Sequence, residues 1–360
     1  MKYHISSTNH KPAYLQLYEQ LREDITKGIL PFGTKLPSKR LLAAETQVSV
    51  ITIQHAYAIL CDEGYTEARQ RSGYFVIYKE NDFLSSSEIF APVSTAAHHM
   101  HSSKSTFPFS VLARTMRRVL SDYQEEILVK SPNHGCPILR LAICAYLARS
   151  RGIFTRPEQI IIGSGAEYLY SLIAQLLGKD RIFALENPSY DKIRRVYQAH
   201  GVQCDLLKMS TDGIRTCELQ RTHASVLHVT PFHSYPSGIT ASASKRREYL
   251  DWAKERDGYI IEDNYDSELT VSRKPEDPLF TMTQDSSVIY LNTFSETIAP
   301  SLRVGYLILP ESLLTPFDER LGFYSCTVPV FEQYVLAELL NSGDFERHIN
   351  RVRRSRRKTK

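Results

Sequence analysis

The stretch that decides the fold reads YIIEDNYDSEL at residues 259–269 and VIYLNTFSETIAPSLRVGYLILP at residues 288–310. The two short apolar runs, Tyr259–Ile261 and Val288–Leu291, predict buried parallel strands, because both faces of such strands are covered. Polar residues follow each run: Glu262 to Tyr265 after the first, and Thr293 to Ser295 after the second. Ligands of open α/β sheets bind beyond the carboxyl ends of the strands, so we expect a site there.

This stretch resembles the cofactor-binding core of fold-type-I aminotransferases, which use pyridoxal phosphate. It is most similar to the version in MocR-type regulators, a branch of the GntR transcription-factor family. The family's Asp-x-Tyr motif is matched by Asp263 and Tyr265. By this resemblance, the carboxylate keeps the pyridine nitrogen protonated, which makes the ring an electron sink, and the tyrosine hydroxyl bonds the ring oxygen.

The second strand of the family is followed by Thr-Phe-Ser-Lys and, seven residues later, by an arginine that binds the cofactor phosphate. Here Thr293, Phe294 and Ser295 match, Arg303 has the expected offset, and the lysine position holds Glu296. A Schiff base requires an amine, which a carboxylate cannot supply. The resemblance therefore implies the fold and the ancestry, but no covalent cofactor attachment, no catalytic residue and no enzyme activity.

Composition places the chain among ordinary globular proteins. With 360 residues, 42% hydrophobic and 23% charged, it can form two or three domains with their own cores. It contains no apolar run of 18 residues and no signal-peptide core, so we expect a cytoplasmic protein outside the membrane. Six scattered cysteines without a CxxC pair indicate reduced thiols, and no metal site is expected.

Residues 10–78 predict a winged helix-turn-helix. A helical period over residues 12–30 places Tyr14, Leu17, Leu21 and Ile25 on one stripe, a second helix begins after Ser38, and a third covers residues 49–63. Residues 65–68 and 74–78 then form a hairpin. The run KLPSKRLLAAETQVSVITIQHAYAILCDEGYTEARQRSGYFV at residues 35–76 resembles the GntR family nearly end to end, which implies binding to double-stranded DNA.

The third helix should enter the major groove. The family commonly has an arginine where Val50 stands; valine cannot read guanine, but it can contact a thymine methyl group. Arg40 should meet a phosphate, and other basic residues could add backbone contacts from the second helix and the wing. An alternative is a wing-like module that now serves only in packing. The expected DNA-binding residues are Lys39, Arg40, Ser49, Val50, Thr52, Gln54, His55, Arg69, Arg71, Ser72 and Gly73.

Residues 79–107 predict a flexible linker, since they are rich in Ser, Ala and His and have no sustained period. Three histidines, His98, His99 and His101, lack the Cys or acidic partners of a metal site. A tether between two domains is the better interpretation.

Residues 108–360 alternate between helix and strand and resemble the large aminotransferase domain, here incomplete. A strand that enters GSGAEYLY at residues 163–170 predicts an anion cradle at a helix N-terminus. By resemblance, Gly165, Ala166 and Glu167 supply backbone donors, and Tyr190 stacks on the cofactor ring. Tyr190 could also be a core residue. His233 could line the site or could be a purely structural histidine.

The C-terminal segment begins a last helix at Asp344 and ends in RVRRSRRKTK, which holds seven of the chain's basic residues. The net charge of +4 is therefore a property of this tail. We interpret the tail as one face of a helix, or alternatively as a patch that aids nucleic-acid contact. Family members usually continue into a small domain, so we expect a truncated relative.

Three functions are compatible with these patterns. The first is a homodimeric DNA-binding regulator whose effector domain binds pyridoxal phosphate noncovalently, or another small effector. The second is a degenerate relative with weak or no cofactor and DNA binding. The third is an active aminotransferase, which Glu296 argues against.

Overall fold

The computed structural model describes residues 3–5, 11–69, 72–79, 107–270, 277–283 and 287–359. The chain divides into two compact units, Met1–His99 and Met100–Lys360. The expected linker lies outside the described residues, except for Lys79 and Phe107, and so do its three histidines. No helix in the described part of the chain is long and apolar enough to cross a membrane.

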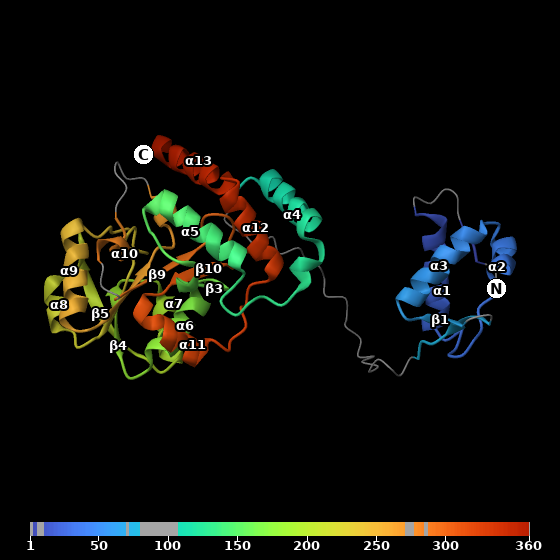
Figure 1. Ribbon diagram of the computed structural model, residues 1–360, viewed down its shortest axis with the longest axis horizontal. Coiled ribbons are helices and arrows are strands. Elements are labelled where there is room, and N and C mark those ends of the chain that lie inside the picture. Colours follow the sequence, from blue (N-terminus) through green and yellow to red (C-terminus); the bar gives the residue numbers. More distant parts are fainter. Residues whose placement is uncertain are drawn as a thin grey trace. The chain divides into compact units, whose positions relative to one another are not determined.

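The N-terminal unit is a three-helix winged fold. Its elements are α1 (Ala13–Thr26), α2 (Lys39–Thr46), α3 (Val50–Asp62), β1 (Thr66–Arg69) and β2 (Gly73–Val76) (Figure 1). Ser38 and Ser49 cap α2 and α3 by accepting N–H groups of Leu41 and Thr52, as N-cap serines do. The two strands pair antiparallel, with Thr66 opposite Val76.

The core of this unit differs from the predicted stripe at one position. Leu17, Leu21 and Ile25 are buried as expected, but Tyr14 is only half-buried. Tyr18 fills the core instead, and Tyr14 packs edge-on against His55 with 5.8 Å between ring centroids. Tyr14 lies at the edge of the predicted stripe, because its ring packs on His55 of α3 and not in the core.

The second unit contains an eight-stranded sheet in the order β3-β10-β9-β8-β7-β4-β5-β6. β4, β5, β7, β8 and β9 run parallel, whereas β10 pairs antiparallel with β3 and β9. The two predicted strands are β8 and β9, which are parallel neighbours, with Asp263 opposite Leu291. The strands are β3 (Ile160–Gly163), β4 (Ile182–Asn187), β5 (Gln203–Ser210), β6 (Gly213–Ile214), β7 (Val226–Val229), β8 (Tyr259–Asp263), β9 (Val288–Thr293) and β10 (Gly305–Ile308).

Helices cover both faces of this sheet. Side chains of β3 alternate between them: Ile160 and Ile162 pack in one hydrophobic cluster, and Ile161 in another. The first cluster contains residues of α4 (Phe109–Tyr123), α5 (Pro137–Arg151), α12 (Val330–Asn341) and α13 (Asp344–Thr359). The second contains residues of α6 (Ala166–Leu177), α7 (Asp191–Ala199) and α11 (Leu314–Leu321). The remaining helices are η2 (Gln124–Leu128), η3 (Pro157–Gln159), α8 (Thr216–Arg221), α9 (Ala243–Glu255), η4 (Ser267–Leu269), α10 (Leu279–Met282) and η5 (Glu311–Leu313).

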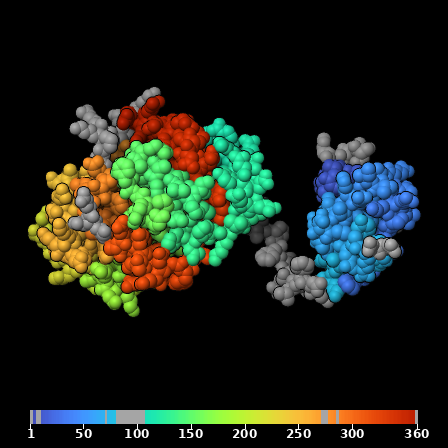
Figure 2. Space-filling view, viewed as in Figure 1, coloured from blue at the N-terminus to red at the C-terminus, as the bar shows by residue number. Residues whose placement is uncertain are grey.

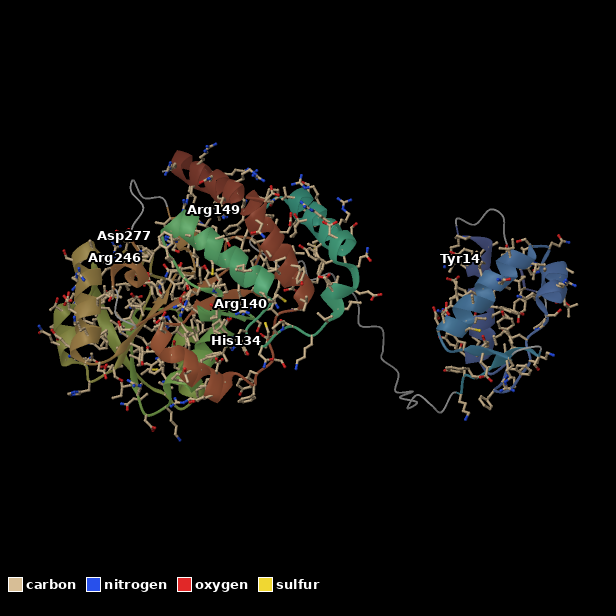
Figure 3. All side chains as sticks on the ribbon, viewed as in Figure 1. Tyr14, His134, Arg140, Arg149, Arg246 and Asp277 are labelled. Carbon is tan, nitrogen blue, oxygen red and sulfur yellow. The ribbon has the colours of Figure 1, made fainter. Side chains whose placement is uncertain are left out.

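The last helix, α13, packs on the molecule's own surface. Figure 2 shows it in red beside the green surface of α5, and Arg149 of α5, labelled in Figure 3, donates to Glu346 of α13 at 2.8 Å. Arg353 Nε donates to the Glu268 carbonyl at 2.6 Å, and Arg356 to the Leu269 carbonyl at 3.2 Å. Part of the basic tail thus holds the loop that follows β8.

Candidate functional site: a pocket at the strand ends and a DNA-reading surface

A cavity of about 250 Å³ lies at the carboxyl ends of β8 and β9. It gathers seven of the predicted cofactor residues and Glu296 in its wall. The lining residues are Ala166, Glu167, Tyr170, Tyr190, Ile193, Thr230, Tyr235, Asp263, Tyr265, Thr293, Ser295, Glu296 and Arg303. The eighth, Gly165, lies directly beneath Arg303: a Cβ at this glycine would be 3.0 Å from Arg303 Nη2.

Asp263 forms the buried end of the pocket. It is 2% exposed, and its Oδ2 accepts the Tyr170 hydroxyl at 2.5 Å. His228 Nε2 lies 3.5 Å from the same oxygen, and the Tyr197 hydroxyl is 2.7 Å from His228 Nδ1. Burial, and then Asp263, raise the pKa of Tyr170 well above its ordinary value, so this hydroxyl stays a donor. Asp263 Oδ1 has no hydrogen-bond partner among the described residues, which marks a place for a donor from a ligand.

Arg303 and the first turn of α6 form the other end. The Glu167 carboxylate pairs with Arg303 and, at 2.9 Å, with Lys192 Nζ. Burial raises the pKa of Glu167, but these hydrogen bonds outweigh it and hold the pKa at about 2. A carboxylate thus occupies the cationic end, and an incoming phosphate has to compete with it. The Gly165 N–H, expected as a phosphate donor, donates to the Gly163 carbonyl at 2.9 Å.

Aromatic side chains form the walls. Tyr190 is 36% exposed, so it is not a core tyrosine, and its ring meets Tyr235 edge-on at 6.2 Å. The Tyr265 hydroxyl donates to the His233 carbonyl at 3.0 Å, while His233 Nδ1 lies 3.2 Å from Asp266. His233 therefore shapes the loop and does not line the cavity.

Glu296 is exposed at the pocket wall. It forms no hydrogen bond or ion pair within the described ranges, unlike Glu167 at the other end. Its neighbour Ser295 donates to the Leu302 carbonyl at 3.2 Å, which ties the turn after β9 to the turn before β10. Among the described lining residues none is a lysine, and no group of His, Cys, Asp and Glu in the described part could hold a metal ion.

The residues fit pyridoxal phosphate in its noncovalent form. Asp263 Oδ1 is an unpaired buried acceptor for a protonated ring nitrogen, and the Arg303 guanidinium, close to Gly165, could pair with a phosphate in place of Glu167. Tyr190 offers a ring face. When bound, the cofactor supplies an electron-withdrawing ring, but none of the lining residues that the structure describes carries an amine to which it could attach.

Sequence reasoning missed the support beneath Asp263. Tyr170 from α6 and His228 from β7 are buried beside this carboxylate, and Tyr197 from α7 supports His228 from behind. One signal was present: Tyr170 is four residues after Ala166, so the same face of α6 reaches the pocket. The contributions of β7 and α7 depend on the order of the strands and had no local signal.

The exposed start of α3 is the candidate DNA-reading surface. Val50 and Ile51 are 42% and 67% exposed, which is unusual for aliphatic side chains at the beginning of a helix. Ser49 is held as the N-cap, with its Oγ 2.9 Å from Thr52 Oγ1. Gln54 and His55 are exposed on the same helix.

Basic residues flank this helix. Lys39 Nζ donates to Gln54 Oε1 at 3.3 Å, so the Gln54 amide keeps its N–H groups free for another acceptor. Arg40 is exposed on α2. On the wing, Arg69 pairs with Glu67 and stacks over Phe75 at 4.5 Å.

The wing also contains one basic residue that the sequence reasoning overlooked. The backbone of Lys35 forms an isolated antiparallel β-bridge with Phe75 of the hairpin. The Lys35 side chain passes close to Gly73, where a Cβ would lie 3.2 Å from Lys35 Cε. Ser72 is exposed at the tip, and Arg71 lies outside the described residues.

Comparisons with known proteins agree with both halves of this description. The family described as "Bacterial regulatory proteins, gntR family" matches residues 13–76. The Bacillus subtilis HTH-type transcriptional regulator YdeL, itself uncharacterized, is 34% identical over 359 residues, with 96% of this chain and 77% of the relative covered. The pyridoxine biosynthesis transcriptional regulator PdxR of Corynebacterium glutamicum is 31% identical, with 97% and 78% covered.

Among solved structures, the kynurenine aminotransferase of Pyrococcus horikoshii, in complex with PMP, superimposes with a TM-score of 0.64 at 25% sequence identity. The match covers 69% of this chain and 64% of that enzyme, so the chain spans less than two thirds of its length. The larger unit therefore has the fold of pyridoxal-phosphate-dependent aminotransferases.

Proposed function

Because the chain belongs to the GntR family of HTH-type transcriptional regulators, we propose that it regulates transcription in the cytoplasm. It carries an aminotransferase-like domain, as MocR- and PdxR-type members do. The pocket of this domain binds a pyridoxyl phosphate noncovalently as the effector. Residues 10–78 bind double-stranded DNA, and residues 108–360 sense the effector and form a homodimer. Residues 79–107 link these two domains. The observation that carries the proposal is the unpaired Asp263 oxygen at one end of a pocket that has Arg303 at the other.

The chain is not an aminotransferase under this proposal. Glu296 stands at the position that the family motif assigns to lysine, and a carboxylate forms no carbon–nitrogen double bond with an aldehyde. PMP in the solved kynurenine aminotransferase supports the idea that this fold accommodates a pyridoxyl phosphate without a covalent bond to the protein.

A gel-shift assay on DNA upstream of the chain's own gene tests the DNA half. The expected result is binding much tighter than to a scrambled duplex of equal length, and weaker binding for Arg40→Ala on every sequence, since a phosphate contact carries no sequence information. Lys179→Ala, at an exposed position of the large unit, is the matched control. Equal affinity for all duplexes with a steep salt dependence would contradict a specific regulator.

Borohydride reduction in the presence of pyridoxal phosphate tests the mode of cofactor binding. We expect no pyridoxyl adduct at the pocket of the natural chain, and an adduct at position 296 in Glu296→Lys, located by peptide mass. An adduct on a pocket residue of the natural chain would overturn the noncovalent assignment, and turnover of an amino acid with a keto acid would establish an enzyme.

A further inference from the structure

The charged side chains that line the pocket carry a net negative charge, because acids outnumber bases among them. Its charged lining residues are three acids, Glu167, Asp263 and Glu296, and one base, Arg303. Glu167 is already neutralised by Arg303 and Lys192. Within the described ranges, no lysine or arginine pairs with Asp263 or Glu296, and the nearest imidazole nitrogen to Asp263 is His228 Nε2, at 3.5 Å.

The two open carboxylates differ in burial, which gives each a separate role. Asp263 lines the cavity, is 2% exposed and has one unpaired oxygen, so it favours a donor that is itself buried, such as a protonated ring nitrogen. Glu296 is exposed on the wall, beside the turn that carries Ser295. A carboxylate there attracts a cation at the pocket edge but gains nothing from a neutral aldehyde.

We propose that Glu296 makes the pocket selective for a pyridoxyl phosphate that carries a primary ammonium group, that is, pyridoxamine 5′-phosphate or an amine of the same shape. The proposal rests on the proposed effector site and deepens it. Such a ligand matches three of the four charged lining residues: its phosphate competes with Glu167 for Arg303, its ring nitrogen meets Asp263, and its ammonium group meets Glu296. In relatives that have lysine at this position, a second cation would repel that ammonium group.

Pyridoxine 5′-phosphate is the matched probe, because it has a hydroxymethyl group where pyridoxamine 5′-phosphate has an aminomethyl group. Neither compound reacts with surface lysines, so calorimetric titration of the full chain measures binding alone. The expected result is that the amine binds about tenfold more tightly than the alcohol, the size of one charge-assisted hydrogen bond. Raising the salt concentration should narrow this difference, because Glu296 is exposed.

Variants separate Glu296 from the rest of the pocket. Glu296→Gln should weaken the amine about tenfold and leave the alcohol within about twofold, which removes the preference. Glu319→Gln, at an exposed position of α11, should change neither affinity. Arg303→Gln should weaken both compounds together, because both carry the phosphate.

Each outcome decides between the two proposals. Equal affinity for amine and alcohol in the natural chain, or an unchanged preference in Glu296→Gln, overturns the selectivity and leaves the pyridoxyl phosphate site standing. Binding of neither compound overturns the effector site as well. Circular dichroism of the variants shows whether a lost affinity reflects a lost fold.

Discussion

At the scale of single residues, buried ionisable groups beneath the pocket determine how the molecule responds to pH. Glu186 of β4 is 3% exposed and accepts the Ser234 hydroxyl at 2.6 Å. Burial raises the pKa of Glu186 to about 8, and the Asp263 carboxylate adds to this. Below this pH, Glu186 is neutral, so it does not repel the neighbouring acid.

This raised pKa predicts a pH dependence of stability. The unfolded chain releases the proton near pH 4.5 while the folded chain keeps it up to about pH 8, so the folded state loses stability as pH rises through this window. In Glu186→Gln, the free energy of unfolding should fall less steeply with rising pH, by up to about 1 kcal/mol per pH unit. Urea unfolding of the large unit across this range measures it, with Asp180→Asn, an exposed acid, as control. Parallel pH profiles of Glu186→Gln and the natural chain would contradict the assignment.

At the scale of secondary structure, the start of α3 departs from a typical DNA-reading helix. Its first two residues, Val50 and Ile51, are aliphatic and exposed, and Ser49 caps the helix so that they project before the second turn. Aliphatic side chains cannot hydrogen-bond to base edges, but they pack on the thymine 5-methyl group. Discrimination between base pairs at these two positions therefore depends on shape and on burial of the methyl group, and the Gln54 amide is the nearby hydrogen-bond donor.

We therefore expect binding to depend on thymine methyl groups. In a duplex selected for tight binding, replacing a thymine opposite α3 by uracil should weaken binding about fourfold, the effect of one buried methyl group. The double variant Val50→Ala, Ile51→Ala should bind both duplexes alike. Uracil outside the protected bases serves as the control. Indifference of the natural chain to uracil at every position would show that these side chains do not read the groove.

At the scale of the whole molecule, the large unit exposes an apolar ridge on α4 and η2. Phe109, Leu120 and Leu128 are 79%, 51% and 81% exposed, and Met116 lies on the same face of α4, four residues before Leu120. Contiguous apolar surface of this kind marks an interaction site. A second copy of the chain is the occupant that the proposed homodimer requires.

Sedimentation velocity tests this assignment. The natural chain, 41.2 kDa, should sediment at about twice this mass. Leu120→Glu should yield monomers, because a charge would be buried without a partner. Ser121→Glu, next in sequence and exposed, should leave the dimer intact. A natural chain that is monomeric at all concentrations, or a dimer that survives Leu120→Glu, would place the interface elsewhere or remove it.

Local sequence patterns determined the elements, and the family resemblance supplied the two ends of the pocket. Apolar runs predicted β8 and β9, and Ser38 predicted the start of α2, whereas Asp263 and Arg303 were assigned to the pocket by the family resemblance. The elements follow from side-chain period, capping and strand polarity, all of which act over a few residues. Boundaries differed by a few residues: the helical period expected over residues 12–30 corresponds to α1, which ends at Thr26.

Tertiary structure alone decided what each polar group faces. The strand order brings His228 to Asp263, the helices on the sheet add Tyr170 to Asp263 and Tyr197 to His228, and the packing of α6 against β10 places Glu167 on Arg303. The sequence by itself determined that an acid stands at position 296; only the fold shows that it lines a pocket with an unpaired buried carboxylate oxygen. The physical reason is range: periodicity and capping act between neighbours in the chain, whereas charge balance depends on groups that only the sheet brings together.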